Sequence, residues 1–402
     1  MEQALSDVKV LDLSWYIAGP YCTKLLADYG ADVIKIERPD GGDPARKMGP
    51  FPADDPHPEK SGLFLYLNTN KRSITLNLKS ATGKLIFREL AQDADILVES
   101  FRPGVMEGLG IGYEELHKIN PRLVVTSVSN FGQTGPYRDY KISDTIAYAM
   151  GGAMYETGVP TRPPVALARN LVLHECGWLA TVGTLGAWYG AAKNGRGDHV
   201  DISFMEAMLG STDRRDTYLL SYAYTGFCSP RQDITMRKRH CLPSGFYPAK
   251  DGWVIAAVGE PDFAKFARGI GRPELLSDER FRNIQDVSLA SELDGYFLEW
   301  LYSHTKQEAS AELQKLGLLV MPVNTPADAF HLSHFRERGF WVETEHPAAG
   351  KLTYPGGPID MGEAGYAMRR PAPLLGQHNE EIYGRLGYTG ERLAKLRAGA
   401  VI

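Results

Sequence analysis

The sequence predicts an α/β fold with a Rossmann-type sheet in its first 130 residues, and three observations carry this prediction. Short apolar runs such as VKVLDLS, residues 8–14, end at a turn, as strands buried in a parallel sheet do. A helical pattern follows at 19–30, with Pro20 suited to its start and Gly30 to its end. Another apolar run, ADVIKIE at 31–37, comes directly afterwards. Strand, helix and strand in this order predict a βαβ unit with a parallel strand pair.

The same alternation continues to residue 129. Further strands are expected at 73–78, 94–100 and 123–129, with helices at 83–94 and 112–119. Repeated βα units of this kind predict an open, doubly wound sheet, in which ligands bind outside the carboxyl ends of the strands.

Beyond residue 143 the pattern changes. Helical stretches are expected at 143–154, 176–192 and 204–224, and residues 244–259 predict two strands around the turn KDG. Two further helices, a loop-rich stretch and a last helix are then expected at 261–271, 292–304, 345–358 and 376–387. We therefore expect a large domain that begins with 1–225, a small α+β domain at 226–325 and a return segment at 326–402 that packs on the large domain.

Composition and charge restrict the class of function. The chain has 402 residues and a formal charge of −5, whereas nucleic-acid-binding proteins are usually basic, so no nucleic-acid partner is expected. Its four cysteines form no CxxC pair, which is typical of a reducing cytoplasm. The N-terminus lacks a signal-peptide pattern, and the uncharged run 176–192 is short and rich in glycine and alanine. We therefore expect a cytoplasmic protein without a membrane span.

One histidine pair has the spacing of metal ligands. His331 and His334 are three residues apart, and Glu337 follows after three more. No second cluster supports a metal site, so structural histidines and no metal are expected.

Cationic residues accompany the ends of three expected strands. Arg38 directly follows strand 31–37, where its guanidinium could bind a phosphate or pair with Glu37 or Asp40. The other cationic residues are Lys71, Arg72 and Lys79 around strand 73–78, and Arg102 beside Phe101 after strand 94–100. Each group alone is also compatible with a solvated strand end or an ordinary turn. Together they favour a site for a ligand with several phosphates.

Six blocks of the sequence resemble the class III CoA-transferase family, which includes formyl-CoA transferase, carnitine CoA-transferase and α-methylacyl-CoA racemase. In order, they are VLDLSWYIAGPYCTKLLADYGADVIKIERPDGGDPAR, NTNKRSITLNLK, DILVESFRPGVM, GQTGPY, NGRGDHVDISFMEAML and PAPLLGQHNEEIYGRLG. The resemblance implies a Rossmann-type large domain made from both chain ends, a smaller inserted domain, and two chains interlocked as a dimer.

The ligand that the resemblance implies is coenzyme A, bound as an acyl-CoA substrate together with a carboxylic acid. The CoA contacts carried over by position are Ile17, Ala18, Arg38, Leu76 to Lys79, Ser100, Phe101, Arg102 and Lys141.

The sequence departs from the family at the centre of its implied chemistry. In the family, an aspartate carboxylate attacks the acyl-CoA thioester and forms a mixed anhydride. We aligned PPVALARNLVLHECGWLATVG on the family without gaps, with Pro163, Pro164, Gly177 and Gly183 as fixed points. This alignment places Leu173 at the position of that aspartate, and leucine cannot form the anhydride. Glu175 lies two residues further on, which is about 200° around a helix, so it should face away.

Three other positions depart from the family pattern. Gly108 stands where the formyl-CoA enzyme has a CoA-binding arginine, and TMRKRHCLPSG, residues 235–245, lacks its run of glycines. The racemase branch needs a His–Asp pair, whereas here Ser143 precedes Asp144.

These features lead to one principal hypothesis and three alternatives. The chain is expected to be the aspartate-lacking subunit of a heteromeric CoA-transferase, with a paralogous subunit supplying the aspartate, as in benzylsuccinate CoA-transferase. Its implied reaction exchanges CoA between a donor such as succinyl-CoA and an aryl- or alkyl-substituted dicarboxylic acid. The alternatives are a homodimeric transferase that uses Glu175, an acyl-CoA isomerase, racemase or lyase that uses Asp144 or Glu175 as a base, and a CoA-binding protein without chemistry.

Overall fold

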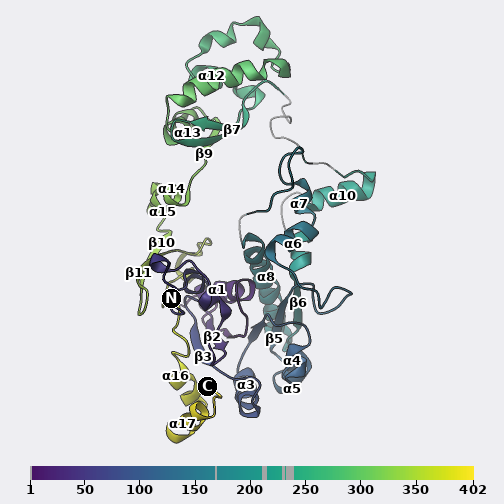
Figure 1. Cartoon of the computed structure of the whole chain (residues 1–402), viewed down its shortest axis with the longest axis vertical. Coiled ribbons are helices and arrows are strands. Elements are labelled where there is room, and N and C mark those ends of the chain that lie inside the picture. Colours follow the sequence, from purple (N-terminus) through teal and green to yellow (C-terminus); the bar gives the residue numbers. More distant parts are fainter. Residues whose placement is uncertain (1, 168–169, 211–214, 229–230, 232–239) are drawn as a thin grey trace. The chain divides into compact units, whose positions relative to one another are not determined.

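The computed structural model describes residues 2–167, 170–210, 215–228, 231 and 240–402, which form two compact units (Figure 1). The large unit comprises 1–154, 166–228 and 337–402, and the small unit comprises 155–165 and 229–336. The small unit therefore takes in two segments, 155–165 and 326–336, that the expected boundaries placed elsewhere. Lys306 Nζ lies 2.6 Å from Asp328, an ion pair that attaches the start of the expected return segment to the small unit.

A six-stranded parallel sheet forms the centre of the large unit, in the order β3-β2-β1-β4-β5-β6. The strands are β1 (Lys9–Asp12), β2 (Asp32–Glu37), β3 (Arg72–Thr75), β4 (Ile96–Glu99), β5 (Val124–Ser129) and β6 (His199–Ser203). The first five confirm the predicted α/β sheet, whereas β6 was not predicted from the sequence. The strand order reverses between β1 and β4, which gives the sheet a topological switch point.

Helices cover both faces of this sheet because neighbouring strand residues alternate between two cores. Val10 packs in the core with helices α1, α6, α8 and α9, and Leu11 packs in the opposite core with α3, α4, α5, α16 and α17. The bounds are α1 (Ala18–Asp28), α3 (Ala81–Gln92), α4 (Val105–Gly108), α5 (Tyr113–Ile119), α6 (Asp144–Met150), α8 (Leu171–Asn194), α9 (Phe204–Gly210), α16 (Asn379–Arg385) and α17 (Gly390–Ala398). The other α-helices described in this unit's part of the chain are α2 (Gly62–Leu67), α7 (Ala153–Glu156) and α10 (Arg215–Thr225). Among the described residues, no helix is both long and apolar enough to cross a membrane.

Helix α8 begins five residues before the uncharged run that predicted it, so Leu173, His174 and Glu175 are all helical. It crosses α1 closely at Gly177. A Cβ atom at Gly177 would lie 2.7 Å from the carbonyl oxygen of Ala18, so only glycine permits this approach. The contact holds the first part of α8 against the start of α1.

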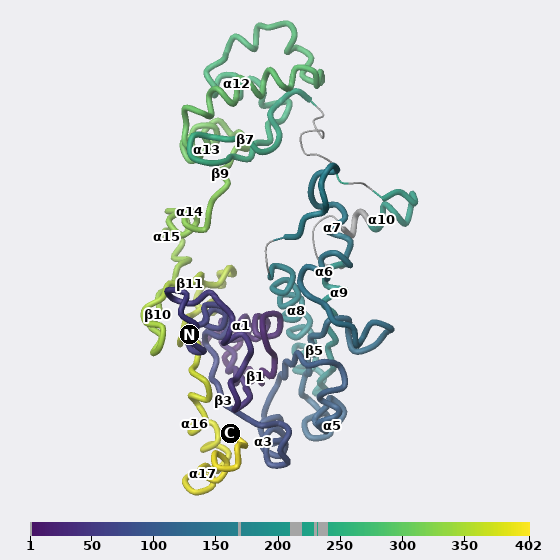
Figure 2. The backbone as a smooth tube through the Cα atoms, viewed as in Figure 1, coloured from purple at the N-terminus to yellow at the C-terminus, as the bar shows by residue number. Residues whose placement is uncertain are grey.

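The return segment completes the large unit at the edge strand β3 (Figure 2). The backbone N–H groups of Ser73 and Thr75 donate to His378 Nδ1 at 3.1 Å and to Asn379 Oδ1 at 2.9 Å. The Tyr383 hydroxyl donates to the Thr75 carbonyl at 2.6 Å. The segment thus satisfies edge groups that would otherwise be unpaired.

The expectation of a loop-rich stretch at 345–358 was wrong. Strands β10 (Trp341–His346) and β11 (Gly350–Pro355) pair there as an antiparallel hairpin. Most of their side chains are exposed or half-buried, so the stretch lacks the apolar run that usually marks a strand. Tyr354 is buried in a small, separate hydrophobic core together with Phe64 and Leu65.

The small unit is an α+β assembly with its own core. Its antiparallel sheet contains β7 (Ser244–Ala249), β8 (Gly252–Ala257) and β9 (Leu319–Pro322), of which β9 was not predicted. Phe266 and Phe297, both fully buried, pack edge to face at 5.4 Å in this core. The helices are α11 (Phe263–Gly269), α12 (Ala290–Tyr302), α13 (Lys306–Lys315), α14 (Pro326–His331) and α15 (Ser333–Glu337).

Candidate functional site

Aromatic and cationic side chains meet at the switch point of the sheet. The Trp15 N–H, after β1, donates to Ser100 Oγ, after β4, at 2.8 Å. The Trp15 and Phe101 rings pack edge to face at 5.5 Å, and the Arg38 guanidinium lies 4.8 Å from the Trp15 ring. The loops after three strands therefore form one surface, as expected for a ligand site in an open α/β sheet.

A cavity of about 450 Å³ lies on this surface. It is lined by Trp15 and by six of the residues carried over as CoA contacts, namely Arg38, Leu76, Asn77, Leu78, Lys79 and Phe101. Arg38 also has the alternative partner considered from the sequence, because its Nε lies 3.8 Å from Asp40. Both groups are exposed, and an exposed pair of this kind leaves the guanidinium available to a ligand.

A second cavity of about 390 Å³ shares Phe101 with the first. Ser100, Arg102 and Lys141 line it, so the structure brings these three carried-over residues together. Arg138 also lines it, and sequence reasoning missed this cation. Its only sequence signal is its place directly after the block GQTGPY.

The remaining positions singled out from the family pattern lie differently. Ile17 and Ala18 are buried at the start of α1, so their side chains do not reach either cavity. Gly108 ends α4 between Val105 and Leu109, which both line the first cavity. A Cβ atom at Gly108 would meet nothing within 4 Å, so packing does not require glycine there. Of the segment 235–245, residues 235–239 lie outside the described residues.

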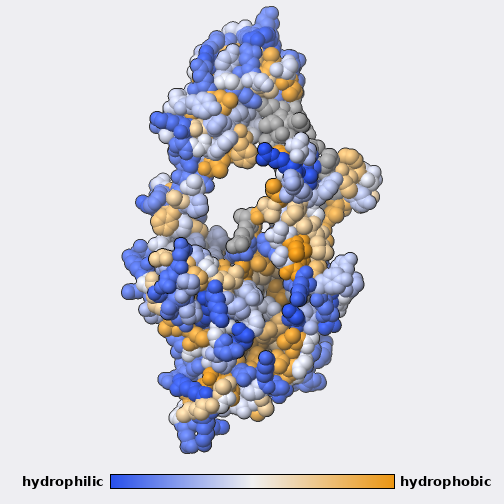
Figure 3. All heavy atoms as spheres, in the orientation of Figure 1, coloured by the Kyte–Doolittle hydropathy of each residue, from blue (hydrophilic) through white to orange (hydrophobic). Residues whose placement is uncertain are grey.

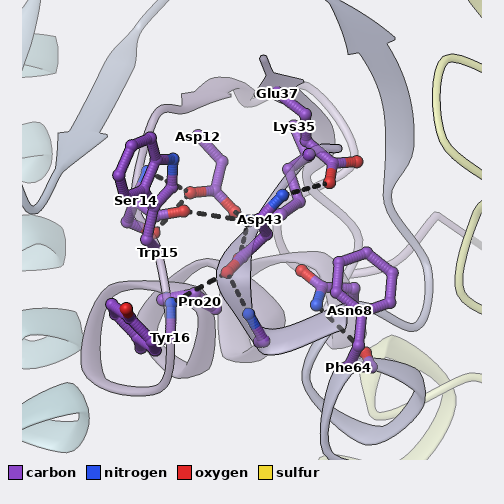
Figure 4. Close-up of polar contacts among 12 residues, drawn as sticks. Asp12, Ser14, Trp15, Tyr16, Pro20, Lys35, Glu37, Asp43, Phe64 and Asn68 are labelled. Atoms are coloured by element: carbon purple, nitrogen blue, oxygen red, sulfur yellow. Dashed lines mark hydrogen bonds and ion pairs between the residues drawn. The ribbon is translucent and has the colours of Figure 1, made fainter. Parts of the chain in front are cut away.

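Buried charges hold the loop after β1 in place (Figure 4). Asp12 accepts hydrogen bonds from the Ser14 N–H at 2.9 Å and from Lys71 Nζ at 2.9 Å. Lys35 Nζ lies 2.9 Å from Asp43 and donates to the Ser14 carbonyl at 2.9 Å. Burial would raise the pKa of Asp12, but Lys35 and Lys71 outweigh it, and the pKa lies below its usual range.

The basic cluster at 71–79 divides between two roles. Lys71 is fully buried against Asp12, and burial lowers its pKa to about 8. Arg72 is buried too, paired with Asp32 and, at 2.7 Å, with Glu381. The sequence left open whether these cations bind a ligand or lie at a solvated strand end. Lys71 and Arg72 are instead buried in ion pairs, and Lys79 is the member of this cluster that lines the cavity.

A buried carboxyl group orients the loop after β4. Glu99 accepts a hydrogen bond from the Phe101 N–H at 2.6 Å and another from Ser127, whose Oγ lies 2.9 Å from His199 Nε2. The His199 ring stacks on Tyr113 at 5.1 Å. Burial raises the pKa of Glu99 to about 7. Sequence reasoning missed this group, because its partners come from β5 and β6.

The start of α8 contains the residues considered as nucleophile or base. Leu173 is half-buried and packs against two hydrophobic cores. Asp144 accepts the Leu173 N–H at 3.3 Å and also binds the backbone of Asn170 and Val172, so it caps the helix. Burial raises the pKa of Asp144. Glu175 is half-buried and, because α8 is regular from Leu171, lies about 200° from Leu173 around the helix axis.

In the part of the chain that the structure describes, no group of three or more His, Cys, Asp or Glu side chains is arranged to hold a metal ion. Arg336 lies 3.0 Å from His331 Nδ1.

The chain is similar to known CoA-transferases along nearly its whole length. The family described as CoA-transferase family III matches residues 5–379. The succinyl-CoA–D-citramalate CoA-transferase of Chloroflexus aurantiacus is 34% identical, over 99% of this chain and 98% of the relative. The succinyl-CoA–L-malate CoA-transferase β subunit of the same bacterium is 34% identical over the same shares. A subunit of the succinyl-CoA:(R)-benzylsuccinate CoA-transferase of Thauera aromatica is 32% identical over 100% of this chain and 99% of the relative. The crystal structure of a CaiB/BaiF family protein from Brucella suis superimposes with a TM-score of 0.84 at 29% identity, covering 96% of this chain and all of that one.

Proposed function

Because the chain belongs to CoA-transferase family III, an enzyme family that moves CoA between acyl-CoA and carboxylic acids, we propose that it acts as the aspartate-lacking subunit of a heteromeric transferase. The proposed substrates are a donor such as succinyl-CoA and an aryl- or alkyl-substituted dicarboxylic acid. The relatives support this choice, because their names pair succinyl-CoA with citramalate, malate or benzylsuccinate, and two of the three are subunits.

The observation that carries the proposal is Leu173 at the start of α8. Its side chain packs into two cores and cannot attack a thioester. Asp144 is engaged by the helix backbone, and Glu175 lies on another side of the helix. The chain matches its relatives over their full length and keeps the cations proposed to bind phosphate, but it lacks the nucleophile. This combination fits a subunit that binds CoA and needs a partner for catalysis.

In the proposed reaction, an aspartate of the paralogous subunit attacks the thioester carbonyl carbon. The carbon–sulfur bond breaks, CoA leaves as the thiolate, and a mixed anhydride forms. The incoming carboxylate then attacks the aspartyl carbonyl, releases the first acid and forms a new anhydride. The thiolate attacks the new acyl group, which gives the product thioester and regenerates the aspartate.

CoA binding is proposed at the two cavities that share Phe101. Arg38 and Lys79 on one side, with Arg102, Arg138 and Lys141 on the other, supply charge for the phosphates. Trp15 and Phe101 offer aromatic surface for the adenine ring.

We also propose that two chains assemble, as an interlocked homodimer or with the paralogue. One face of the small unit's sheet supports this, because aligned apolar residues of β7, β8 and β9 are exposed there (Figure 3). Phe246, Ile255 and Met321 lie in register and are 54%, 42% and 50% exposed. An apolar sheet face of this kind favours burial against another surface.

The test is to express the chain alone and with the paralogue that carries the aspartate, and to measure CoA transfer from succinyl-CoA. Activity is expected only from the pair. Substitution of the paralogue's aspartate should lower the rate of CoA transfer by several powers of ten. Glu175→Gln in this chain should leave turnover within a few-fold.

The opposite results would identify the alternatives. If the chain alone is active and Glu175→Gln inactivates it, or if an acyl adduct maps to Glu175 by mass spectrometry, this chain carries its own nucleophile. Leu173→Asp is the complementary variant, and we expect it not to activate the chain alone, because Gly108 leaves the CoA site without the family's arginine.

A further inference from the structure

A third cavity lies beside the start of α8. It has a volume of about 760 Å³ and is lined by Met48, Pro50, Leu63 and Tyr66, two glycines, Asn170 and His174. Its walls are therefore mainly apolar and aromatic. Burial raises the pKa of Tyr66, which keeps that phenol neutral. Among the described lining residues, His174 is the one side chain that can carry a positive charge.

The ring of His174 is fixed in orientation and in tautomer. Nδ1 lies 2.8 Å from the carbonyl oxygen of Asn170, one turn earlier in the chain. A carbonyl can only accept, so Nδ1 carries a hydrogen and Nε2 is the nitrogen with the free lone pair in the neutral ring. The ring also packs edge to face on Tyr21 at 4.9 Å. Nε2 has no hydrogen-bond partner among the described residues and is available to a ligand in the cavity.

We propose that the His174 ring, with a proton on Nε2 as well as on Nδ1, donates a hydrogen bond from Nε2 to the second carboxylate of the acid substrate, the one that does not form the thioester. This inference rests on the proposed function, since it specifies how this chain would select a dicarboxylic acid. The apolar walls would receive the alkyl or aryl substituent, and the imidazole would supply the one charge-assisted hydrogen bond.

The position of the ring supports a binding role. His174 is half-buried at the cavity wall, directly after Leu173, where the family pattern would place the reacting carboxylate. The ionisable groups near it are Asp144 from α6, Tyr21 from α1 and Tyr66 from α2. Asp144 is already engaged as a helix cap, so it does not compete for Nε2.

The test variant is His174→Asn. The asparagine amide can still donate to the Asn170 carbonyl, but it has no group at the position of Nε2. His304→Asn is the matched control, because His304 Nδ1 lies 2.7 Å from the carbonyl of Trp300, also four residues earlier, in the small unit. Thermal unfolding of both variants checks the fold.

Two measurements decide the proposal. The complete enzyme is given succinyl-CoA and either ¹⁴C-labelled succinate or ¹⁴C-labelled butyrate, which lacks the second carboxylate, and the label that enters the acyl-CoA is measured. His174→Asn should lower the preference for succinate, as the ratio of kcat/KM values, about tenfold, with CoA affinity unchanged. In the full chain labelled with ¹⁵N-histidine, with CoA present, succinate should shift the ring resonance that is lost in His174→Asn, and butyrate should not.

An equal loss of activity toward both acids would assign His174 a structural role and overturn the proposal. A ring resonance that succinate leaves unmoved would also overturn it. If the wild-type enzyme binds CoA but transfers it to no dicarboxylic acid, the proposed function fails, and the resonance titration alone decides the role of His174.

Discussion

Replacement of Glu99 by glutamine tests the buried carboxyl group that orients the loop after β4. Glu99 is 4% exposed, and burial raises its pKa from 4.5 to about 7. The folded protein therefore holds a proton at Glu99 up to about pH 7, whereas the unfolded chain releases it near pH 4.5. Since the folded state binds more protons in this window, the free energy of unfolding falls as the pH rises from about 4.5 to 7.

The size of this effect follows from the two pKa values. The difference between 4.5 and about 7 corresponds to a loss of ~3 kcal/mol above pH 7. Glutamine is neutral at every pH, and its amide oxygen can still accept the Phe101 N–H bond. Glu99→Gln should therefore match the wild type near pH 4.5 and exceed it by up to ~3 kcal/mol at pH 8.

The assay is urea unfolding of both proteins at several values between pH 4.5 and 8, scored as variant minus wild type. Other titrating groups cancel in that difference. Glu114→Gln on α5, an exposed glutamate, is the control and should show no such trend. A difference for Glu99→Gln that does not change across this range would refute the reasoning, because Glu99 would then titrate alike in both states.

Variants at three further positions test the CoA site and the start of α8. Lys79→Ala should weaken CoA binding, measured by calorimetry, by about 1–3 kcal/mol if its ammonium binds phosphate, and exposed Lys315→Ala should not. Asp144→Ala should lower the free energy of unfolding by about 1 kcal/mol through loss of a helix cap. Asp144→Asn keeps an accepting oxygen and should keep turnover, so its inactivity would assign Asp144 a catalytic role. Gly177→Ala puts a Cβ atom 2.7 Å from the Ala18 carbonyl oxygen and should destabilise the fold by about 1–3 kcal/mol, and an unchanged thermal midpoint would contradict that close approach.

Much of the fold follows from patterns within short windows of the sequence. The apolar runs at 8–14 and 31–37 contain β1 and β2, and the helical pattern between them, 19–30, covers all of α1 except its first residue. The sequence also indicated that Arg38, Lys79 and Arg102 follow or flank strand ends. Because parallel strands place their carboxyl ends at one edge, such residues converge without any knowledge of the core.

The tertiary structure alone decided which charged groups face a ligand and which stabilise the fold. Lys71 and Lys79 look alike in sequence, yet Lys71 pairs with Asp12, 59 residues away, and Lys79 lines a cavity. Glu99 likewise depends on Ser127 and His199 from later strands. Local periodicity specifies helices and strands because it repeats within one element. The pairing of buried charges depends on residues that only the folded sheet brings together, so no window of the sequence contains it.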